Sequence, residues 1–391
     1  MPVINRVADM HDQMTEWRHD IHARPELGFQ EFRTSKLIAD KLRDFGVDEV
    51  VTGVGGTGVV GIIRGQGEGQ AIGLRADIDA LPIEEATGAP YASKNAGVMH
   101  ACGHDGHTTM LLGAAKYLAE TRNFSGAVFA IFQCAEENLG GATRMIEDGL
   151  FERFPMKQIY GLHNWPSLPA GHFQWRDGPI MAAAANITIE ITGRGAHGAW
   201  PHLSHDPIVC AAAMIGELQS IVSRSIDPLE AAVVTIAQIN AGSTFNVIPS
   251  TARMMGTARW LSDEVGDLIE RRMTEIVNGI AALHGCTASL SFERSFSVVL
   301  NDPEANVLAR RAAETVLGEG RVSAMPLPVM GSEDFGFMLE GRPGSYVVLG
   351  SGRTGKDPGL HSPRFDFNDE ILPLGASYWA TLVEQLLPRA A

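Results

Sequence analysis

The chain has 391 residues, 45% of them hydrophobic, a length that predicts two or three domains with sizeable buried cores. With 31 Lys and Arg against 46 Asp and Glu, its net charge of -15 argues against nucleic acid and anionic membranes as partners. The first thirty residues lack the apolar stretch of a signal peptide, no run of 18 apolar residues occurs, and four cysteines are too few for a disulfide framework, so we expect a cytoplasmic protein with free thiols.

The first third of the chain alternates between the two hydrophobic periods. Helical spacing marks residues 34–45 and 108–120, whereas short apolar runs predict strands at 59–63, 71–74, 128–132 and 159–162. Interleaved helices and buried strands are typical of an α/β layered domain. The same pattern returns after residue 302, with a further strand predicted at 346–349.

A glycine-rich segment, Gly53 to Gly58, matches the G-x-G-x-x-G pattern of dinucleotide-binding loops. That loop must open a helix, but the apolar run that follows it predicts a strand. We therefore interpret the segment as a turn that leads into a strand.

In the middle of the chain the pattern becomes that of a sheet with one wet face. Ile187, Ile189 and Ile191 alternate with polar residues along 186–192. Helices at 207–225 and 263–284 and strands at 232–239, 252–260 and 287–293 complete an α+β unit with a four-stranded sheet and two helices. We therefore predict an inserted domain at 182–294, and a catalytic α/β domain with a central mixed sheet formed by 1–181 and 295–391.

The densest group of ligand-type residues falls within eight positions and comprises His100, Cys102, His104, Asp105 and His107. The one-residue spacing of Cys102 and His104 suits two donors on the same side of an extended segment, as a metal site requires. The alternative is a polar loop before a helix that Asp105 caps.

Further candidates lie after predicted strands. Glu136 and Glu137 follow an apolar strand, where two adjacent carboxylates are costly unless a cation or a proton is close. His163 follows the strand at 159–162, and His361 lies in a late loop. A lone histidine is more often structural, but ligands of two-metal sites lie where loops converge at the carboxyl ends of strands, and these positions fit that layout.

In these motifs the chain resembles the dinuclear metallo-aminoacylase and carboxypeptidase family of clan MH, and within it the hippurate hydrolases and N-acyl-amino-acid (auxin-conjugate) amidohydrolases. The segments that carry the resemblance span residues 17–367 and are RHDIHARPELGFQE, LRADIDALPI, HACGHDGHTTMLLGAA, AEENLGGA, GLHNWP, GRGAHGAWPH and LHSPRFDF. The resemblance implies a catalytic α/β domain with an inserted lid domain through which two chains form a homodimer, or more chains a tetramer.

The resemblance also implies a role for each metal-site residue. Cys102 is a thiolate that bridges two metal ions, with Glu137 and His361 completing one site and His104 and His163 the other. Glu136 is the general base, and Asp77 is a carboxylate behind the ligands. One departure is Arg75, which stands where other branches of the family place a metal-binding histidine, and His104 compensates for it.

Three lid residues match positions that relatives use around the substrate, partly from the partner subunit. His197 stabilises the oxyanion of the carbonyl, and Arg259 holds the substrate carboxylate with Asn246 nearby in the lid. His100, Asp105 and His107 have weaker parallels and lie behind the ligands at best.

The implied activity is metal-dependent hydrolysis of the amide bond of N-acyl or N-aroyl amino acids, with water activated by two divalent ions and its proton taken by Glu136. Thiolate and imidazole ligands favour zinc and leave manganese, cobalt and nickel open. Within the family, an N-acetyl-diaminopimelate deacetylase and a small-peptide carboxypeptidase are the alternatives.

Two interpretations lie outside this reaction. A hydrolase with Cys102 as nucleophile leaves Glu136, Glu137, His163 and His361 without roles. A non-catalytic dimeric binding protein would be supported by a degenerate ligand set, whereas every ligand position is filled here.

Overall fold

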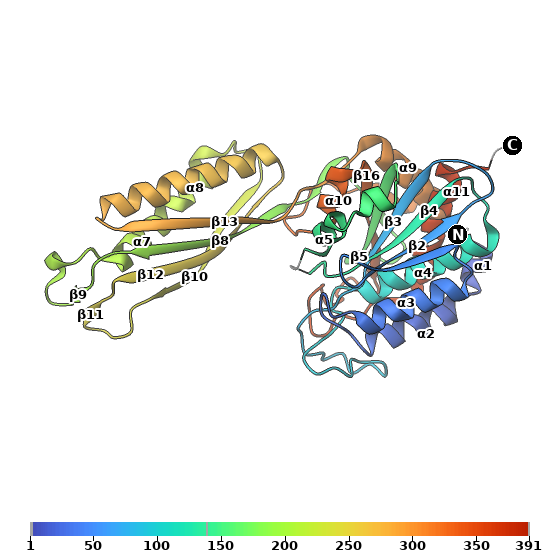
Figure 1. The fold of residues 1–391 in the computed structure, drawn as a ribbon, viewed down its shortest axis with the longest axis horizontal. Coiled ribbons are helices and arrows are strands. Elements are labelled where there is room, and N and C mark those ends of the chain that lie inside the picture. The colour runs from blue at the N-terminus through green and yellow to red at the C-terminus, as the bar shows by residue number, and fades with distance from the viewer. Residues whose placement is uncertain (1–2, 138–139, 390–391) are drawn as a thin grey trace. The chain divides into compact units, whose positions relative to one another are not determined.

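A computed structural model describes residues 3–137 and 140–389, and it divides the chain into two compact units (Figure 1). Unit 1 comprises the residues up to Ile180, Val299–Pro328 and the residues from Asp334 on. Unit 2 comprises Met181–Val298 and Val329–Glu333. The bounds expected from the sequence, 182–294, leave out the last residues before Val299 and the short returning segment at 329–333.

Unit 1 is built on an eight-stranded mixed sheet with the strand order β1-β2-β4-β3-β5-β16-β6-β15. Its strands are β1 (Glu49–Val54), β2 (Gly58–Arg64), β3 (Ala71–Asp77), β4 (Ala127–Gln133), β5 (Gln158–Pro169), β6 (Phe173–Trp175), β15 (Val322–Ala324) and β16 (Gly344–Gly352). Parallel pairing joins β4 to β3, β3 to β5 and β5 to β16. The predicted α/β class with a central mixed sheet is confirmed.

The central strands have continuous apolar sequences, which explains why they lie in the buried middle of the sheet. Six of the seven residues in β3 and in β4 are buried, as expected for strands that are covered on both faces. The helices of unit 1 are α1 (Asn5–Ala8), α2 (His11–His22), α3 (Phe32–Asp44), α4 (His104–Thr121), α5 (Gly141–Glu147), α6 (Leu150–Arg153), α9 (Pro303–Leu317), α10 (Phe335–Gly341) and α11 (Leu372–Leu386). Because α4 packs against the sheet and against α2 and α11, it is buried nearly all round.

Unit 2 contains a four-stranded antiparallel sheet with the order β10-β12-β8-β13. Its elements are β8 (Ala183–Thr192), β9 (Ala196–His197), α7 (Pro207–Ser220), β10 (Ala232–Ala241), β11 (Val247–Ile248), β12 (Thr251–Trp260), α8 (Asp263–Leu283) and β13 (Thr287–Phe296). The predicted helix at 207–225 ends as α7 at Ser220, and a π-helical turn, Ile221–Ser225, continues it. Ile187, Ile189 and Ile191 are buried beneath the two long helices, and the residues between them are more exposed, as the alternation predicts.

Short elements complete the structure. Strands β7 (Gly178–Met181) and β14 (Val299–Asn301) pair with each other, and 3-10 turns occur at Pro201–Leu203, Glu319–Arg321 and Asp369–Ile371. The glycine-rich segment forms the turn of the antiparallel hairpin between β1 and β2, and Gly53, Gly55 and Gly56 take positive φ angles there, so it leads into a strand as predicted. Within the described ranges, no helix has the length and apolar character needed to span a membrane.

Candidate metal centre

The site lies where neighbouring strands of unit 1 end. Strand β3 lies between β4 and β5 and is parallel to both, so the chain leaves all three at the same edge of the sheet. Asp77 is the last residue of β3, and Glu136 and Glu137 follow β4. His163 lies within β5, not after it as expected, two residues beyond Gly161, which pairs with Arg75 of β3. Cys102 precedes α4, which His104 opens.

The remaining ligand candidate, His361, comes from the loop after β16. Its backbone N–H donates a 2.8 Å hydrogen bond to the carbonyl oxygen of Ala101, which ties this loop to the segment that carries Cys102. His361 has a φ of 62°, an uncommon conformation for a residue with a side chain. Its position is therefore fixed by contacts within unit 1.

The structure brings the five predicted ligands together in two groups that share Cys102. One group is Cys102, His104 and His163, and the other is Cys102, Glu137 and His361; within each, the donor atoms lie within 4.8 Å of one another. Cys102 Sγ is 3.4 Å from His163 Nε2, and Glu137 Oε1 is 3.2 Å from His361 Nε2 and 4.0 Å from His104 Nε2. These are the two ligand sets that the family resemblance implies.

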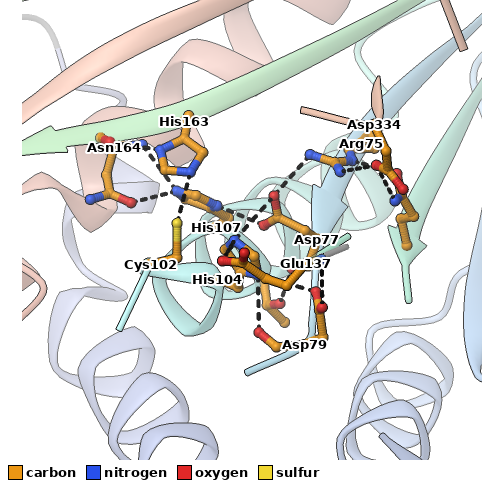
Figure 2. Close-up of polar contacts among 12 residues, drawn as sticks. Arg75, Asp77, Asp79, Cys102, His104, His107, Glu137, His163, Asn164 and Asp334 are labelled. Atoms are coloured by element: carbon orange, nitrogen blue, oxygen red, sulfur yellow. Dashed lines mark hydrogen bonds and ion pairs between the residues drawn. The ribbon is translucent and has the colours of Figure 1, made fainter. Parts of the chain in front are cut away.

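The outer nitrogens of two histidines fix how their rings are protonated (Figure 2). His163 Nδ1 lies 2.7 Å from the carbonyl oxygen of Asn164, and His104 Nδ1 lies 3.0 Å from that of Asp79. Because a carbonyl oxygen only accepts, Nδ1 donates in both rings. Burial holds the pKa of His163 well below its usual value, so its Nε2 carries a free lone pair toward Cys102.

Two atoms in this cluster are buried without a hydrogen-bonding partner among the described residues, His104 Nε2 and Glu137 Oε1. Burial lowers the pKa of His104, but the negative charge of Asp77 and the hydrogen bond to Asp79 outweigh it and hold that pKa well above the usual value, so the pocket attracts positive charge. Burial also raises the pKa of the Cys102 thiol, so a nearby cation favours its thiolate form. Sulfur, imidazole and carboxylate donors gathered within 4.8 Å in each of two groups fit two divalent metal ions.

Among the other polar residues of the motif at 100–107, only His107 joins a further group of potential ligands within the described part of the chain, with Asp77 and His104. His107 Nδ1 is 2.7 Å from Asp77 Oδ1, and its Nε2 accepts from the backbone N–H of Asn164, so both ring nitrogens are engaged. The alternative interpretation, in which Asp105 caps this helix, is wrong. Helix α4 begins at His104, and Asp105 pairs with Arg18 at 3.0 Å and with His22 at 2.8 Å. His100 is buried and joins no group of potential ligands among the described residues.

Arg75 and Asp77 form an ion pair behind the cluster. Arg75 is buried and donates to Asp77 Oδ2 at 2.8 Å, to Gln133 Oε1 at 2.8 Å and to Asp334 Oδ1 at 3.3 Å (Figure 2). Asp77 also contacts His107, while its distance to His104 Nε2 is 3.7 Å. The arginine thus anchors the carboxylates of Asp77 and Asp334.

Sequence reasoning missed Asp79, which contacts two of the proposed ligands. Its carbonyl oxygen and Oδ1 accept from His104 Nδ1, and its Oδ2 accepts from the backbone N–H of Glu137 at 3.0 Å. Such a partner orients a ligand and strengthens it as a donor. The sequence did contain an indication of Asp79, because this residue lies only two positions after Asp77, at the end of a strand. Asn164 and Asp334 were missed in the same way.

His197 and Asn246 lie side by side in unit 2. His197 pairs with Val247 across β9 and β11, and the carbonyl oxygen of Asn246 accepts from Gly198 N–H at 2.8 Å. His197 Nδ1 accepts from the N–H of Ala199 at 3.1 Å, so the proton of the neutral ring is on Nε2. Both residues are exposed.

Arg259 occupies the other end of the unit 2 sheet. It pairs with Ala184 at the start of β8, about 26 Å along β12 from Thr251, whereas Asn246 precedes β12. The expectation that Asn246 lies near Arg259 in the same lid is therefore wrong, because the length of β12 separates them. Arg259 Nη1 donates to Met330 O at 2.8 Å and to Ser332 Oγ at 2.9 Å.

Comparisons with known proteins agree with this geometry. The model of a family described as "Peptidase family M20/M25/M40" matches residues 73–385. The chain is 44% identical over 387 residues to the hippurate hydrolase of Campylobacter jejuni, covering 99% of this chain and 100% of that protein. It is 40% identical to the IAA-amino acid hydrolase ILR1-like 2 of Arabidopsis thaliana, over 98% of this chain and 87% of the relative. A solved dinuclear metal-binding M20 peptidase of Bacillus subtilis superposes with a TM-score of 0.85 at 35% identity, covering 97% of this chain and 99% of the other.

Proposed function

The chain belongs to peptidase family M20/M25/M40 and is an amidohydrolase, and from this premise we propose that it hydrolyses the amide bond of N-acyl or N-aroyl amino acids that carry a free α-carboxylate. The observation that carries the proposal is the pair of ligand groups sharing Cys102, with Glu136 beside them. Cys102, His104 and His163 would hold one divalent ion, and Cys102, Glu137 and His361 the other. When bound, such ions lower the pKa of water and polarise a carbonyl group.

Glu136 is the proposed general base. It is 6% exposed, and its carboxylate lies within 4.8 Å of the donor atoms of His104 and Glu137. From there it takes the proton of the attacking water and returns it to the leaving nitrogen. Glu137 shares the strand end but faces His361, which supports its different role as a ligand.

His197 is the proposed donor to the carbonyl oxygen as that oxygen becomes negative. Because its Nδ1 accepts from Ala199, its exposed Nε2–H is free to donate to an oxyanion. His197 and Asn246 are separated from Arg259 by the length of β12. One active site cannot take all three from the same chain, so we propose that His197 and Asn246 serve the site of a partner subunit.

Mixing two inactive variants tests this arrangement. Glu136→Gln and His197→Ala chains, after subunit exchange, are expected to regain about a quarter of the wild-type activity, because half of the dimers are mixed and one of their two sites is intact. The measurement is hydrolysis before and after exchange. The control is Glu136→Gln mixed with the double variant Glu136→Gln/His197→Ala, which has no intact combination. Absence of recovery after verified exchange contradicts the arrangement.

Arg259 is the proposed clamp for the substrate carboxylate. Only Nη1 of its guanidinium bonds to the described residues, so Nε and Nη2 remain free to hold a carboxylate through two hydrogen bonds. Its contacts with Met330 and Ser332 fix the group in one orientation. An acidic protein needs such a local cation to bind an anionic substrate.

A hydrolysis panel tests both the substrate class and the clamp. N-benzoyl, N-acetyl and indolylacetyl amino acids, N-acetyl-diaminopimelate and dipeptides are each compared as free acids and amides. We expect free acids to be preferred, and Arg259→Ala to lower kcat/KM on them about 10- to 100-fold, as for a lost charged hydrogen bond. Arg253→Ala is the matched control, because Arg253 lies exposed on the same strand. Equal rates on acids and amides contradict the clamp.

The remaining parts of the proposal follow from the chemistry of the donors. We infer zinc as the native metal from the thiolate and imidazole ligands, with manganese, cobalt or nickel as the alternatives that metal analysis distinguishes. A dimer, or a tetramer built from dimers, is the assembly that the shared site requires. All four cysteines are free, which fits the proposed cytoplasmic location.

A further inference from the structure

Ala135 has a backbone conformation that few alanines adopt. Its φ is 51°, and it is one of four non-glycine residues with positive φ among those described; His361 is another. Left-handed conformations are disfavoured for residues with a Cβ and persist only where their surroundings hold them. Two such residues at one site indicate that the left-handed conformation contributes to the arrangement of that site.

The conformation of Ala135 explains how Glu136 and Glu137 reach the same site. Successive residues of a strand point to opposite faces, so two adjacent carboxylates cannot both face one cluster in regular extended chain. The turn at Ala135, two residues beyond the end of β4, breaks this alternation. Carboxylate oxygens of both glutamates then lie within 4.8 Å of His104 and of each other.

The turn is held by Glu31, a buried residue that is absent from the ligand groups. Glu31 Oε1 accepts from the backbone N–H of Ala135 at 2.8 Å, and Oε2 accepts from the Thr57 hydroxyl at 2.6 Å. Glu31 is 0% exposed, and the groups that donate to its carboxylate, the Thr57 hydroxyl and the Ala135 N–H, are neutral. The carbonyl oxygen of Ala135 accepts from Gly141 N–H at 2.9 Å, which closes the turn from its other side.

An unpaired buried carboxylate is costly to maintain. Burial raises the pKa of Glu31 to about 7, although the hydrogen bond from Thr57 opposes this. An apolar side chain of similar size would avoid this penalty but could not accept a hydrogen bond from the N–H of Ala135. The retained carboxylate therefore points to its contact with Ala135.

We propose that Glu31 is a positioning residue that holds Ala135 in its left-handed conformation and thereby aims Glu136 and Glu137 at the metal centre. Asp79 holds the other end of the same segment through the N–H of Glu137. The inference rests on the proposed roles of the two glutamates, but the contact itself can be measured without metal or substrate.

The first test is amide hydrogen exchange of the metal-free protein. In Glu31→Ala the Ala135 amide loses its acceptor, and we expect the peptide that contains it to exchange at least about tenfold faster than in the wild type. Glu31→Gln keeps a carbonyl oxygen for Ala135 and an amide that can donate to Thr57, so its exchange should stay near that of the wild type. Unchanged exchange in Glu31→Ala overturns the proposal.

The second test measures metal affinity and kinetics. Glu31→Ala is expected to lower metal affinity and kcat about 10- to 100-fold, with KM changed little, as for other residues that orient ligands. Adding Ala135→Gly should raise kcat about tenfold, because glycine adopts the left-handed conformation without the penalty that Glu31 offsets. Rescue by glycine separates positioning from a general loss of packing, and its absence overturns the proposal.

Two further results keep the test decisive. Where Glu31→Ala does not fold, as judged by circular dichroism, Thr57→Val takes its place; it removes one donor to Glu31 at constant volume and should show the same changes on a smaller scale. A wild-type protein that binds no metal and hydrolyses no substrate contradicts the proposed function, whereas the exchange measurement still decides the contact between Glu31 and Ala135.

Discussion

Exhaustive chelation is expected to abolish amide hydrolysis, and zinc, manganese or cobalt is expected to restore it. The five proposed ligands come from four separated segments, and burial raises the pKa of the Cys102 thiol, so a bound cation favours the thiolate that holds it. Without metal, nothing lowers the pKa of water toward neutral pH, and Glu136 alone faces water with its ordinary, high pKa. Metal analysis should find about two ions per active chain, and full activity in a protein verified as metal-free contradicts the proposed function.

Chelation also separates the metal mechanism from a cysteine hydrolase. Cys102 Sγ is 3.4 Å from His163 Nε2, a distance that would also suit a nucleophile and its base. A thiol enzyme keeps its activity after chelation. Cys102→Ser should lose metal together with activity, whereas Cys210→Ser, at a buried cysteine of unit 2, serves as the matched control and should keep both.

The site was predictable where strong local patterns meet the ends of strands. The apolar runs at 71–74, 128–132 and 159–162 correspond to β3, β4 and β5, because strands covered on both faces leave continuous apolar sequence. The polar residues that follow these runs are those that meet in space. Their individual roles came from the family resemblance, since spacing alone does not distinguish Glu136 from Glu137.

The rest depends on contacts between segments that are distant in sequence. Glu31 reaches Ala135 across more than a hundred positions, and no periodicity records that contact or the left-handed φ that it holds. The separation of Asn246 from Arg259 was within reach, because the predicted strand at 252–260 already lies between them. The expectation that Asn246 lies near Arg259 relied on their shared role around the substrate and neglected the distance that an extended strand spans.

Glu136→Gln is expected to lower kcat by about two to four orders of magnitude while leaving fold and metal content unchanged. Glutamine has the shape of glutamate but cannot take a proton from water, and a positioned acid-base group is worth about this much. The measurements are kcat with saturating substrate and metal analysis of the same preparation. Glu147→Gln is the matched control, because Glu147 lies exposed at the end of α5 and should leave kcat unchanged.

Glu137→Gln, in contrast, should lower the metal content of the protein. Glu137 Oε1 is buried next to His361 Nε2, and replacing the carboxylate by a neutral amide removes the negative charge that a divalent ion needs at this position. We expect metal affinity to fall about 10- to 100-fold, as for a weakened ligand shell, and part of the activity to return when metal is added in excess. The two glutamates are adjacent, and losing either is expected to lower activity, so the variants discriminate by metal content rather than by activity. If Glu136→Gln lost the metal and Glu137→Gln kept it, the assignment of base and ligand would have to be exchanged.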